Sequence, residues 1–480
     1  MDAHESVLDL IGRTPLVRVR TPEGDRGAAV YAKLEYLSVG GSVKDRIAAN
    51  MVRQAERDGL LRPGGTIVEA TSGNTGIGIA MVAAERGYRA VVVVSDRVSS
   101  EKTATLRALG AEVVVRPAGL PREHPDHPVN TAARIAAETP NGWLADQYDN
   151  PANPEAHYLS TGPEIWRQTD GRITHLVSCI GTGGTISGTG RYLKEASDGR
   201  VQVIGADPAS SVYAGGDGSP YFIEAAGHFR HPDTLADTWP KSYHQDVVDR
   251  VLPVADHDAL LTLRQLAREQ GLLVGGSSGT ALAAARQVAA EAGPDAVVVV
   301  ILPDSGRQYL SKYFDDTWML RLGFLDGDPS HPRVGDAAPT DEHTAPLPYL
   351  NTHTTVGDAL AALRTLAEAG RPAVLPTGPC PDGRRPTAPE LTGSVTLSDL
   401  ETTLRAGRAT PTDPLGSHPG PPLPHCGHGE PADTALTRLT TQGTEIAVVL
   451  RDGRAMSLVR PADLRVLSPI AHAVRTTLRD

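Results

Sequence analysis

The stretch Gly40-Gly41-Ser42-Val43-Lys44-Asp45-Arg46 indicates the fold most directly. A run typical of a β-strand, residues 29–35, precedes it, and a helical pattern from Ile47 to Gly59 follows it. Its two glycines allow a tight turn, and its serine and aspartate suit the start of a helix. Lys44 is therefore predicted at a strand-to-helix turn, where the sites of α/β proteins tend to lie. A lysine there can be a nucleophile if its surroundings lower its pKa, whereas most lone lysines are solvated surface residues.

Outward from this turn, strands and helices alternate. The strand-like segment Thr66–Ala70 leads into the loop Thr71-Ser72-Gly73-Asn74-Thr75-Gly76, and His175–Ile180 leads into Gly181-Thr182-Gly183-Gly184-Thr185. Helical patterns follow both loops, and the alternation continues to a strand over residues 296–302. Strands separated by helices of this length predict an α/β fold with parallel sheets.

The composition limits the function classes. A chain of 480 residues suggests two or three domains, and 40% hydrophobic with only 4% aromatic residues predicts a core of Ala, Val, Leu and Ile. A net charge of −11 argues against nucleic acid or an acidic membrane as a partner. Because no apolar run is long enough to span a bilayer and no signal peptide is evident, we expect a cytoplasmic protein. Three cysteines, at 179, 380 and 426, are too few for a disulfide framework.

The two polar loops are candidate anion sites. Each precedes a helix N-terminus, which carries unpaired N–H groups and a partial positive charge. The loop Gly181–Thr185 could wrap a phosphate with backbone amides and two hydroxyls, and the loop Thr71–Thr75 could bind a carboxylate. Either loop alone could equally be a tight turn. A dinucleotide-binding loop is the rival interpretation, but Ile186 stands where that motif requires its third glycine.

Two anion-binding loops and a lysine loop together fit pyridoxal phosphate better than a dinucleotide. This cofactor needs a lysine for its Schiff base, a phosphate cup and a partner for its pyridine nitrogen. Ser277, in the third glycine-rich loop Gly275-Gly276-Ser277-Ser278-Gly279, is the candidate for that partner.

These motifs occur together, in order and at matching intervals, in a known family. Residues 4–325 resemble the fold-type II pyridoxal-phosphate enzymes of the cystathionine β-synthase and cysteine synthase family. The resemblance implies two parallel-sheet α/β subdomains and a catalytic domain over residues 1–325. It also implies that Lys44 is the catalytic residue and binds the cofactor covalently. The other cofactor-binding residues implied by the resemblance are Asn74, Gly181, Thr182, Gly183, Gly184, Thr185 and Ser277. The implied residues for the amino-acid substrate are Thr71, Ser72, Thr75, Gln147 and Tyr148.

The implied chemistry is β-replacement, in which L-serine condenses with L-homocysteine to give L-cystathionine and water. Sulfide or another nucleophile, with O-acetylserine or O-phosphoserine as donor, is the first alternative, and a non-catalytic binding protein is the second. Two departures from the family pattern concern this choice. Ser38-Val39 replaces the usual Asn-Pro, and the loop over residues 224–240, which faces the second substrate in the family, is longer and lacks a glycine. The chain lacks the extension that carries haem in the animal enzymes, so no haem is expected.

A change of composition follows the catalytic region. Residues 326–344 are dense in Gly, Pro, Asp and His, which predicts a linker, and residues 345–475 contain a weak duplication. The duplication resembles a tandem CBS (Bateman) module of α+β structure, which favours cystathionine β-synthase-like over cysteine synthase-like enzymes. Thr396 and Asp399 fit the T-x-x-D ribose pattern of such modules, so an adenosyl ligand is one expectation and a bracing module in a homodimer or homotetramer is the other. The tract that contains His425 and Cys426 fits no metal-ligand spacing, and we expect a solvated loop and no metal.

Overall fold

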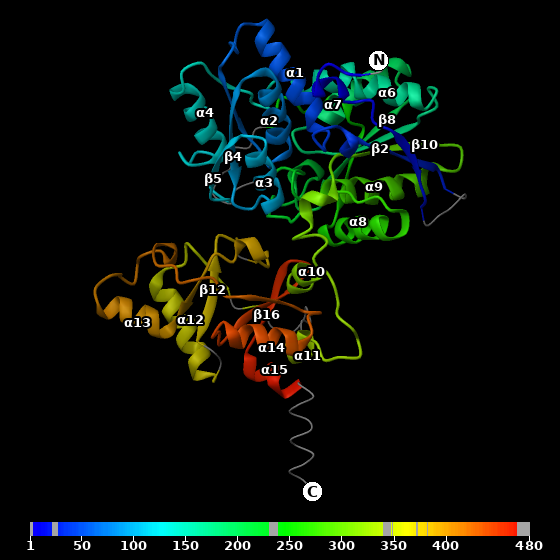
Figure 1. Cartoon of the computed structure of the whole chain (residues 1–480). Coiled ribbons are helices and arrows are strands. Elements are labelled where there is room, and N and C mark those ends of the chain that lie inside the picture. The colour runs from blue at the N-terminus through cyan, green and yellow to red at the C-terminus, as the bar shows by residue number, and fades with distance from the viewer. Residues whose placement is uncertain are drawn as a thin grey trace. The chain divides into compact units, whose positions relative to one another are not determined.

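The computed structural model describes residues 3–21, 27–229, 239–338, 347, 349–370, 373–381 and 383–467 (Figure 1). The chain divides into two compact units, Met1–Phe314 and Asp315–Asp480. Within the described residues, no helix is long and apolar enough to cross a membrane.

The N-terminal unit contains two sheets. The larger has six strands in the order β1-β2-β10-β7-β8-β9, of which only β1 runs antiparallel to its neighbour. Its strands are β1 (Leu16–Val19), β2 (Ala29–Leu34), β7 (His175–Cys179), β8 (Gln202–Pro208), β9 (Arg250–Val254) and β10 (Val297–Leu302). The smaller sheet has the order β5-β4-β3-β6 and is entirely parallel. Its strands are β3 (Thr66–Ala70), β4 (Arg89–Ser95), β5 (Glu112–Arg116) and β6 (Gly142–Leu144). The predicted α/β class with two parallel-sheet subdomains is confirmed.

Helices cover the faces of both sheets (Figure 1). The helices of this unit are α1 (Lys44–Arg57), α2 (Asn74–Arg86), α3 (Ser100–Ala108), α4 (Pro128–Glu138), α5 (Ala152–Leu159), α6 (Thr161–Gln168), α7 (Gly184–Ala196), α8 (Asp256–Gln270) and α9 (Gly276–Ala292). Helix α9 packs against β10 and β7, and α4 packs against β3. Short 3-10 turns occur at Val7–Leu10, Glu35–Leu37, Val212–Ala214, Gln245–Val247 and Gly306–Tyr309.

The central strands are buried along almost their whole length. All five residues of β3 are buried, and in the sequence VVVVIL of β10 only the first is not. This is the pattern of a parallel sheet with helices on both faces. Parallel strands also bring their carboxyl ends to one edge, so the loops that follow β2, β7 and β10 of the larger sheet lie close together, and Asn74, which follows β3 of the smaller sheet, lines the same cavity.

The C-terminal unit consists of two similar halves, each with a three-stranded sheet in which one pair is parallel and the other antiparallel. The first half comprises β11 (Leu350–Asn351), α12 (Val356–Glu368), β12 (Val374–Gly378), β13 (Gly393–Thr396) and α13 (Leu397–Arg405). The second comprises β14 (His425–Gly427), α14 (Ala432–Thr441), β15 (Ala447–Arg451), β16 (Arg454–Val459) and α15 (Pro461–Leu467). Further 3-10 turns lie at Ala388–Glu390 and Leu415–Ser417. This arrangement agrees with the α+β module implied by the resemblance.

The start of this unit differs from the linker expected from composition. Helices α10 (Asp316–Arg321) and α11 (Val334–Ala337) belong to it, and Val334 lies in its core beside Cys426. The backbone N–H of Val334 donates to the carbonyl of Glu430 at 2.9 Å. The Gly- and Pro-rich composition therefore reflects turns that pair with the second half of the C-terminal unit. Residues 339–344 of the expected linker lie outside the described residues.

The expectation of a solvated loop at His425 and Cys426 is wrong. Both residues lie in β14, which pairs in parallel with β15, and Cys426 is fully buried. Among the described residues, no three His, Cys, Asp or Glu side chains gather as a metal site.

Candidate active site

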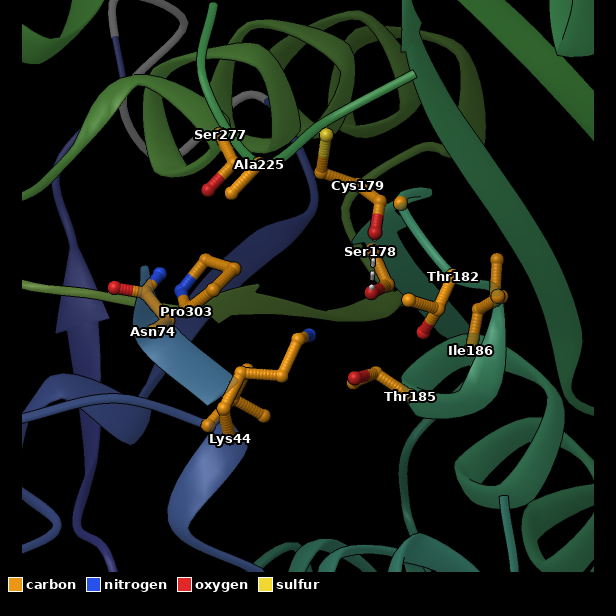
Figure 2. Close-up of a pocket in the computed structure, with 13 residues that line it drawn as sticks. Lys44, Asn74, Ser178, Cys179, Thr182, Thr185, Ile186, Ala225, Ser277 and Pro303 are labelled. Atoms are coloured by element: carbon orange, nitrogen blue, oxygen red, sulfur yellow. Dashed lines mark hydrogen bonds between the residues drawn. The ribbon is translucent and has the colours of Figure 1, made fainter. Parts of the chain in front are cut away.

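Lys44 is the first residue of α1, and its amine points into a cavity (Figure 2). A backbone hydrogen bond fixes the loop that presents Lys44, because the N–H of Val43 donates to the carbonyl of Pro303 at 2.8 Å. Burial lowers the pKa of Lys44, and the negative charge of Asp304 opposes that effect. The amine is thus easier to deprotonate than a surface lysine, as a nucleophile or base requires.

The loop Gly181–Thr185 lies on the opposite side of this cavity. It joins β7 to the N-terminus of α7, whose first N–H groups have no acceptor within the helix. Gly183 has a φ of +86°, and a Cβ there would lie 2.4 Å from the Cβ of Tyr243, so the loop conformation requires glycine. The Thr182 hydroxyl accepts from Asn153 at 3.1 Å, which leaves its own hydrogen for the cavity.

A buried histidine supports the same loop. In His157, Nδ1 lies 2.9 Å from the Thr161 hydroxyl and Nε2 lies 3.2 Å from the Thr185 hydroxyl. Burial, with the positive charges of Lys44 and Arg46, lowers the pKa of His157 well below its usual value, so the ring is neutral. If Nδ1 accepts from Thr161, Nε2–H donates to Thr185, whose hydrogen is then available to an anion in the cavity.

Asn74 and Ser277 lie together on the other side of the cavity (Figure 2). Asn74 begins α2, and its Nδ2 donates to Asp304 Oδ2 at 2.8 Å. Ser277 is the second residue of α9 and is 2% exposed. The structure thus brings together side chains from four separate loops, with the Lys44 amine between an amide–hydroxyl side and a hydroxyl-rich loop.

A larger cleft of about 760 Å³ continues from Lys44, and its lining includes Ser72, Asn74, Thr75, Gln147 and Tyr148. The Thr75 hydroxyl donates to Gln147 Oε1 at 2.6 Å, and Gln147 Nε2 donates to the carbonyl of Ala70 at 3.1 Å. Burial, followed by the nearby Glu69 carboxyl, raises the pKa of Tyr148 to about 12, so its hydroxyl stays protonated.

Thr71 has a different place from the other predicted substrate residues. Its hydroxyl accepts from the N–H of Gly73 at 3.1 Å, and it is not among the side chains that line the described part of the cleft. Its contact shapes the turn that presents Ser72 and Asn74.

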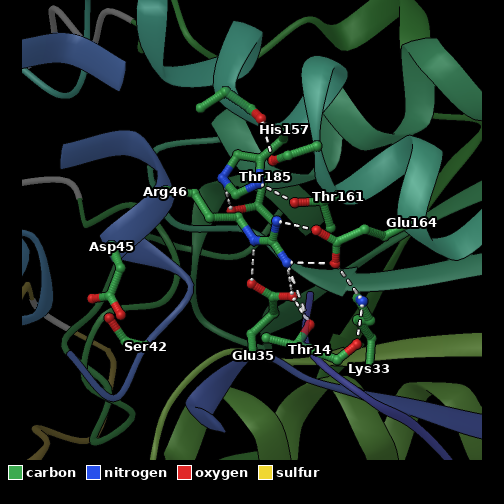
Figure 3. Close-up of polar contacts among 12 residues, drawn as sticks. Thr14, Lys33, Glu35, Ser42, Asp45, Arg46, His157, Thr161, Glu164 and Thr185 are labelled. Carbon is green, nitrogen blue, oxygen red and sulfur yellow. Dashed lines mark hydrogen bonds and ion pairs between the residues drawn. The ribbon is translucent and has the colours of Figure 1, made fainter. Parts of the chain in front are cut away.

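Behind the lysine loop lies a buried cluster of charges (Figure 3). Arg46, two residues after Lys44, lies between Glu35 and Glu164, and Lys33 donates to Glu164 at 2.7 Å. These charges pair with each other, and none of their side chains is among those that line the cavity, so the cluster anchors the first turn of α1.

Four residues near the site were missed in the sequence analysis. Cys179 and Ala225 line the cavity, and Asp304 binds Asn74. Glu69, whose pKa burial raises to about 8, lies under Gln147, whose N–H donates to it at 3.4 Å. Asp304 was recognisable as a polar residue two positions after a buried parallel strand, which is where α/β sites lie.

Comparison with known proteins agrees with this geometry. The family described as pyridoxal-phosphate dependent enzyme matches residues 7–304. Cystathionine β-synthase of Oryctolagus cuniculus is 40% identical over 423 residues, which cover 85% of this chain and 72% of that protein. The Saccharomyces cerevisiae enzyme is 35% identical, covering 83% and 81%. The chain belongs to the cystathionine β-synthase family of pyridoxal-phosphate-dependent enzymes. The Apis mellifera member is 43% identical over 321 residues, which span 63% of that protein.

Two solved structures are similar to about two thirds of this member of the cystathionine β-synthase family. One is a hydrogen sulfide-producing enzyme from Fusobacterium nucleatum, 33% identical with a TM-score of 0.59. The match includes 64% of this chain and all of the Fusobacterium nucleatum chain. The other is an O-ureido-L-serine synthase with O-ureido-L-serine bound, 37% identical with a TM-score of 0.59. It is covered to 98% and covers 66% of this chain.

The residues present fit the cofactor of the family. Pyridoxal phosphate carries its aldehyde on a pyridine ring that also bears a ring oxygen and a phosphate group, and the cavity places the Lys44 amine between two polar sides. Asn74 Nδ2 donates one hydrogen to Asp304 and retains a second N–H for the ring oxygen, and the α7 N-terminus with its hydroxyls suits an anion.

In the C-terminal unit, Thr396 and Asp399 contact each other. The Thr396 hydroxyl accepts from the Asp399 N–H at 3.0 Å and donates to its carboxylate at 2.7 Å, forming the N-terminal cap of α13. Thr355 and Asp358 form the same contacts at the start of α12. The T-x-x-D pattern thus has a capping function in both places.

Proposed function

We propose that this protein condenses L-serine with L-homocysteine to form L-cystathionine and water. The carrying observation is that the Lys44 amine lies between the Asn74–Ser277 side and the Gly181–Thr185 loop, at the inner end of a polar cleft. Relatives named cystathionine β-synthase match across both units of the chain, which supports this substrate pair.

Each part of the site has a distinct task in this proposal. Lys44 binds the cofactor covalently, Asn74 donates to its ring oxygen, the Gly181–Thr185 loop holds its phosphate and Ser277 faces its ring nitrogen. Bound pyridoxal phosphate supplies the electron sink that permits loss of the α-proton and the β-hydroxyl of serine. A serine at the ring nitrogen, in place of a carboxylate, disfavours a protonated pyridine and therefore favours elimination over transamination.

The first substrate is an amino acid with a free carboxylate. The side chains proposed to bind that carboxylate are Ser72, Thr75 and Gln147, with Thr71 shaping the turn and Tyr148 beside the substrate. Lys44 Nζ, whose pKa burial lowers, takes the α-proton and can return it to the departing hydroxyl.

The second substrate enters through the outer part of the cleft. Arg122 and Lys241 line the cleft; Lys241 pairs with Asp149 at 3.1 Å, and Arg122 offers positive charge for the carboxylate of an amino-acid thiol. The amide of Asn130 holds the arginine loop, because its Nδ2 donates to the carbonyls of Arg122 at 2.8 Å and His124 at 2.9 Å. Homocysteine has a carboxylate for this region, whereas sulfide does not.

Sulfide or another small nucleophile, with a different activated serine, is the second candidate. Two solved structures of similar fold are named for sulfide production and for O-ureido-L-serine synthesis. The loop over 224–240, which departs from the family pattern, contributes Ala225, Ala226 and Gly227 to the cleft, and its residues 230–238 lie outside the described residues.

For the C-terminal unit we propose regulation by an adenosyl ligand at Asp399, in a cytoplasmic homodimer or homotetramer. The resemblance to Bateman modules supports the ligand. An adenosyl ligand stimulates only by binding the active state more tightly than the inactive one.

A substrate matrix tests the proposed reaction. Serine, O-acetylserine and O-phosphoserine are each combined with homocysteine, sulfide and cysteine, and products are identified by mass spectrometry. Cystathionine from serine and homocysteine at the highest kcat/KM supports the proposal, whereas preferred cysteine formation from an activated serine and sulfide replaces it. Borohydride reduction should attach the cofactor to Lys44, and label on another lysine would refute that assignment.

A further inference from the structure

Three loops of the site meet at one residue that the family motifs do not include. Asp304 follows β10 and forms an isolated antiparallel bridge with Ser42 in the lysine loop. Its carbonyl accepts from the N–H of Gly275, in the third glycine-rich loop, at 3.0 Å. Its carboxylate accepts from Asn74 at 2.8 Å. Asp304 therefore contacts the lysine loop, the Asn74 helix and the Ser277 loop at once.

The carboxylate of Asp304 is enclosed. The residue is fully buried, and a Cβ at Gly275 would lie 2.0 Å from its Oδ1. That oxygen has no hydrogen-bond partner among the described residues. A buried carboxylate is costly unless its charge is compensated, so its persistence here requires nearby positive charge.

A chain of hydrogen bonds supplies that charge. The Tyr309 hydroxyl donates to Asp304 Oδ2 at 2.5 Å, and the Lys102 ammonium donates to Tyr309 at 2.7 Å. Lys102 is fully buried, and its ammonium also forms an ion pair with Glu224 at 3.1 Å. Lys312 forms a second ion pair with Glu224 at 2.6 Å. These hydrogen bonds and ion pairs thus connect the Asn74 amide with Glu224. The next residue, Ala225, lines the cavity.

We propose that Asp304 is a positioning residue that orients the Asn74 amide toward the cofactor ring and, through Tyr309 and Lys102, holds residues 224–227 at the same cavity. Turning the amide over would place Asn74 Oδ1 against the carboxylate, so the amide keeps its nitrogen toward Asp304 and its second N–H remains for the ring oxygen. The charge of Asp304 also favours a proton on the Lys44 nitrogen. This inference rests on the proposed cofactor site and is independent of the substrate pair.

The first test is a double-variant cycle on cofactor affinity. Asp304→Asn, Asn74→Ala and the double variant are compared with wild type by equilibrium dialysis against pyridoxal phosphate. Loss of one charged hydrogen bond predicts about 10- to 100-fold weaker binding for Asp304→Asn. If Asp304 acts through Asn74, the double variant binds about as weakly as Asn74→Ala alone. Losses that multiply, as for independent sites, would overturn the inference.

The second test is spectroscopic and keeps the fold intact. Tyr309→Phe removes the hydroxyl that binds Asp304. Tyr88→Phe is the matched control, because its hydroxyl also donates to a carboxylate, that of Glu56 at 2.8 Å, and Tyr88 is not among the described residues that line the cavity or the cleft.

The visible absorption of the bound cofactor is followed as pH rises. For Asp304→Asn the lysine nitrogen should lose its proton about one pH unit earlier than in wild type. Tyr309→Phe should also change this titration, and Tyr88→Phe should leave it unchanged. Identical titrations for all variants would refute the positioning role. A wild-type protein that binds cofactor but does not form cystathionine would refute only the proposed reaction.

Discussion

The guanidinium of Arg46 and the carboxylate of Glu164 form two parallel hydrogen bonds, each 2.8 Å long. Their side chains are 3% and 9% exposed, and Glu164 also accepts from Lys33 at 2.7 Å. Bidentate pairs of this kind combine energy with defined geometry. Because Arg46 follows Lys44 by two residues in α1, the pair holds the helix turn that presents the Lys44 amine.

Removing one carboxylate from this cluster should destabilise the protein strongly. Glu164→Gln leaves Arg46 and Lys33 partly unpaired, so the free energy of unfolding should fall by about 3–5 kcal/mol. Glu155→Gln is the control, because it breaks an exposed pair with Arg191 and should cost less than about 1 kcal/mol. Urea denaturation at pH 7 measures both, and equal losses would contradict a structural role for the cluster.

The same carboxylate predicts the pH dependence of stability. Hydrogen bonds and charges from Arg46 and Lys33 outweigh burial and lower the pKa of Glu164 to about 2. A lowered pKa means that the stabilisation is complete above the unfolded value of about 4.5 and is lost as pH falls toward 2. Unfolding of wild type between pH 6 and 2 should show this loss, and Glu164→Gln should show a flatter curve.

The residue proposed at the pyridine nitrogen can be tested by charge. Ser277→Asp should place an anion there and raise the proton affinity of the nitrogen. We expect turnover to fall by about 100-fold or more, since each pKa unit corresponds to a factor of ten. Ser277→Ala, which adds no charge, is the control and should retain most activity. Unchanged turnover in the aspartate variant with cofactor bound would show that Ser277 does not face the ring.

The outer cleft should distinguish thiols by their carboxylate. Arg122→Ala should raise the KM for homocysteine about tenfold or more, the value of one charged hydrogen bond. It should not change the KM for 3-aminopropane-1-thiol, which lacks the carboxylate. Arg134→Ala removes a cation of the neighbouring helix that does not line the described cleft and should have no effect. Equal effects on both thiols would argue against carboxylate binding at Arg122.

The two capping aspartates offer a matched pair for the C-terminal unit. Asp399→Ala and Asp358→Ala each remove a carboxylate that accepts from the N-cap threonine hydroxyl at 2.7 Å, and each leaves the threonine cap in place. If Asp399 contacts a ribose, only Asp399→Ala should abolish binding of S-adenosylmethionine, AMP or ATP in calorimetry. No binding of any of these at millimolar concentration by wild type would end the ligand hypothesis. Equal loss in both variants would indicate a structural effect alone.

The position of a truncation should follow the packing of residues 315–338. A chain that ends at Phe314 should stay soluble and bind the cofactor, because the N-terminal unit has its own core. A chain that ends at Gly327 retains α10 without the second half that it packs against, so it should aggregate more readily. Light scattering and cofactor titration compare the two. Less aggregation of the chain that ends at Gly327 than of the chain that ends at Phe314 would contradict a domain boundary at Phe314.

The sequence by itself determined the fold class and the principal candidate residues. Strand, glycine-rich loop and helix follow each other locally at Lys44, Asn74 and Gly181–Thr185, and the residue types in each loop state what it can bind. Each of these features depends only on residues that are close together in the sequence, so a pattern of a few residues is enough to predict it. The duplication of the C-terminal unit was detectable for the same reason.

Only the tertiary structure decided which distant groups meet. Asp304 lies 230 positions from its partner Asn74, and Lys102 lies 122 positions from Glu224. The same holds for the packing of α11 on the second half of the C-terminal unit, which composition suggested to be a linker. Contacts between residues far apart in the chain depend on how strands and helices assemble, and that order is set by the burial of the whole core.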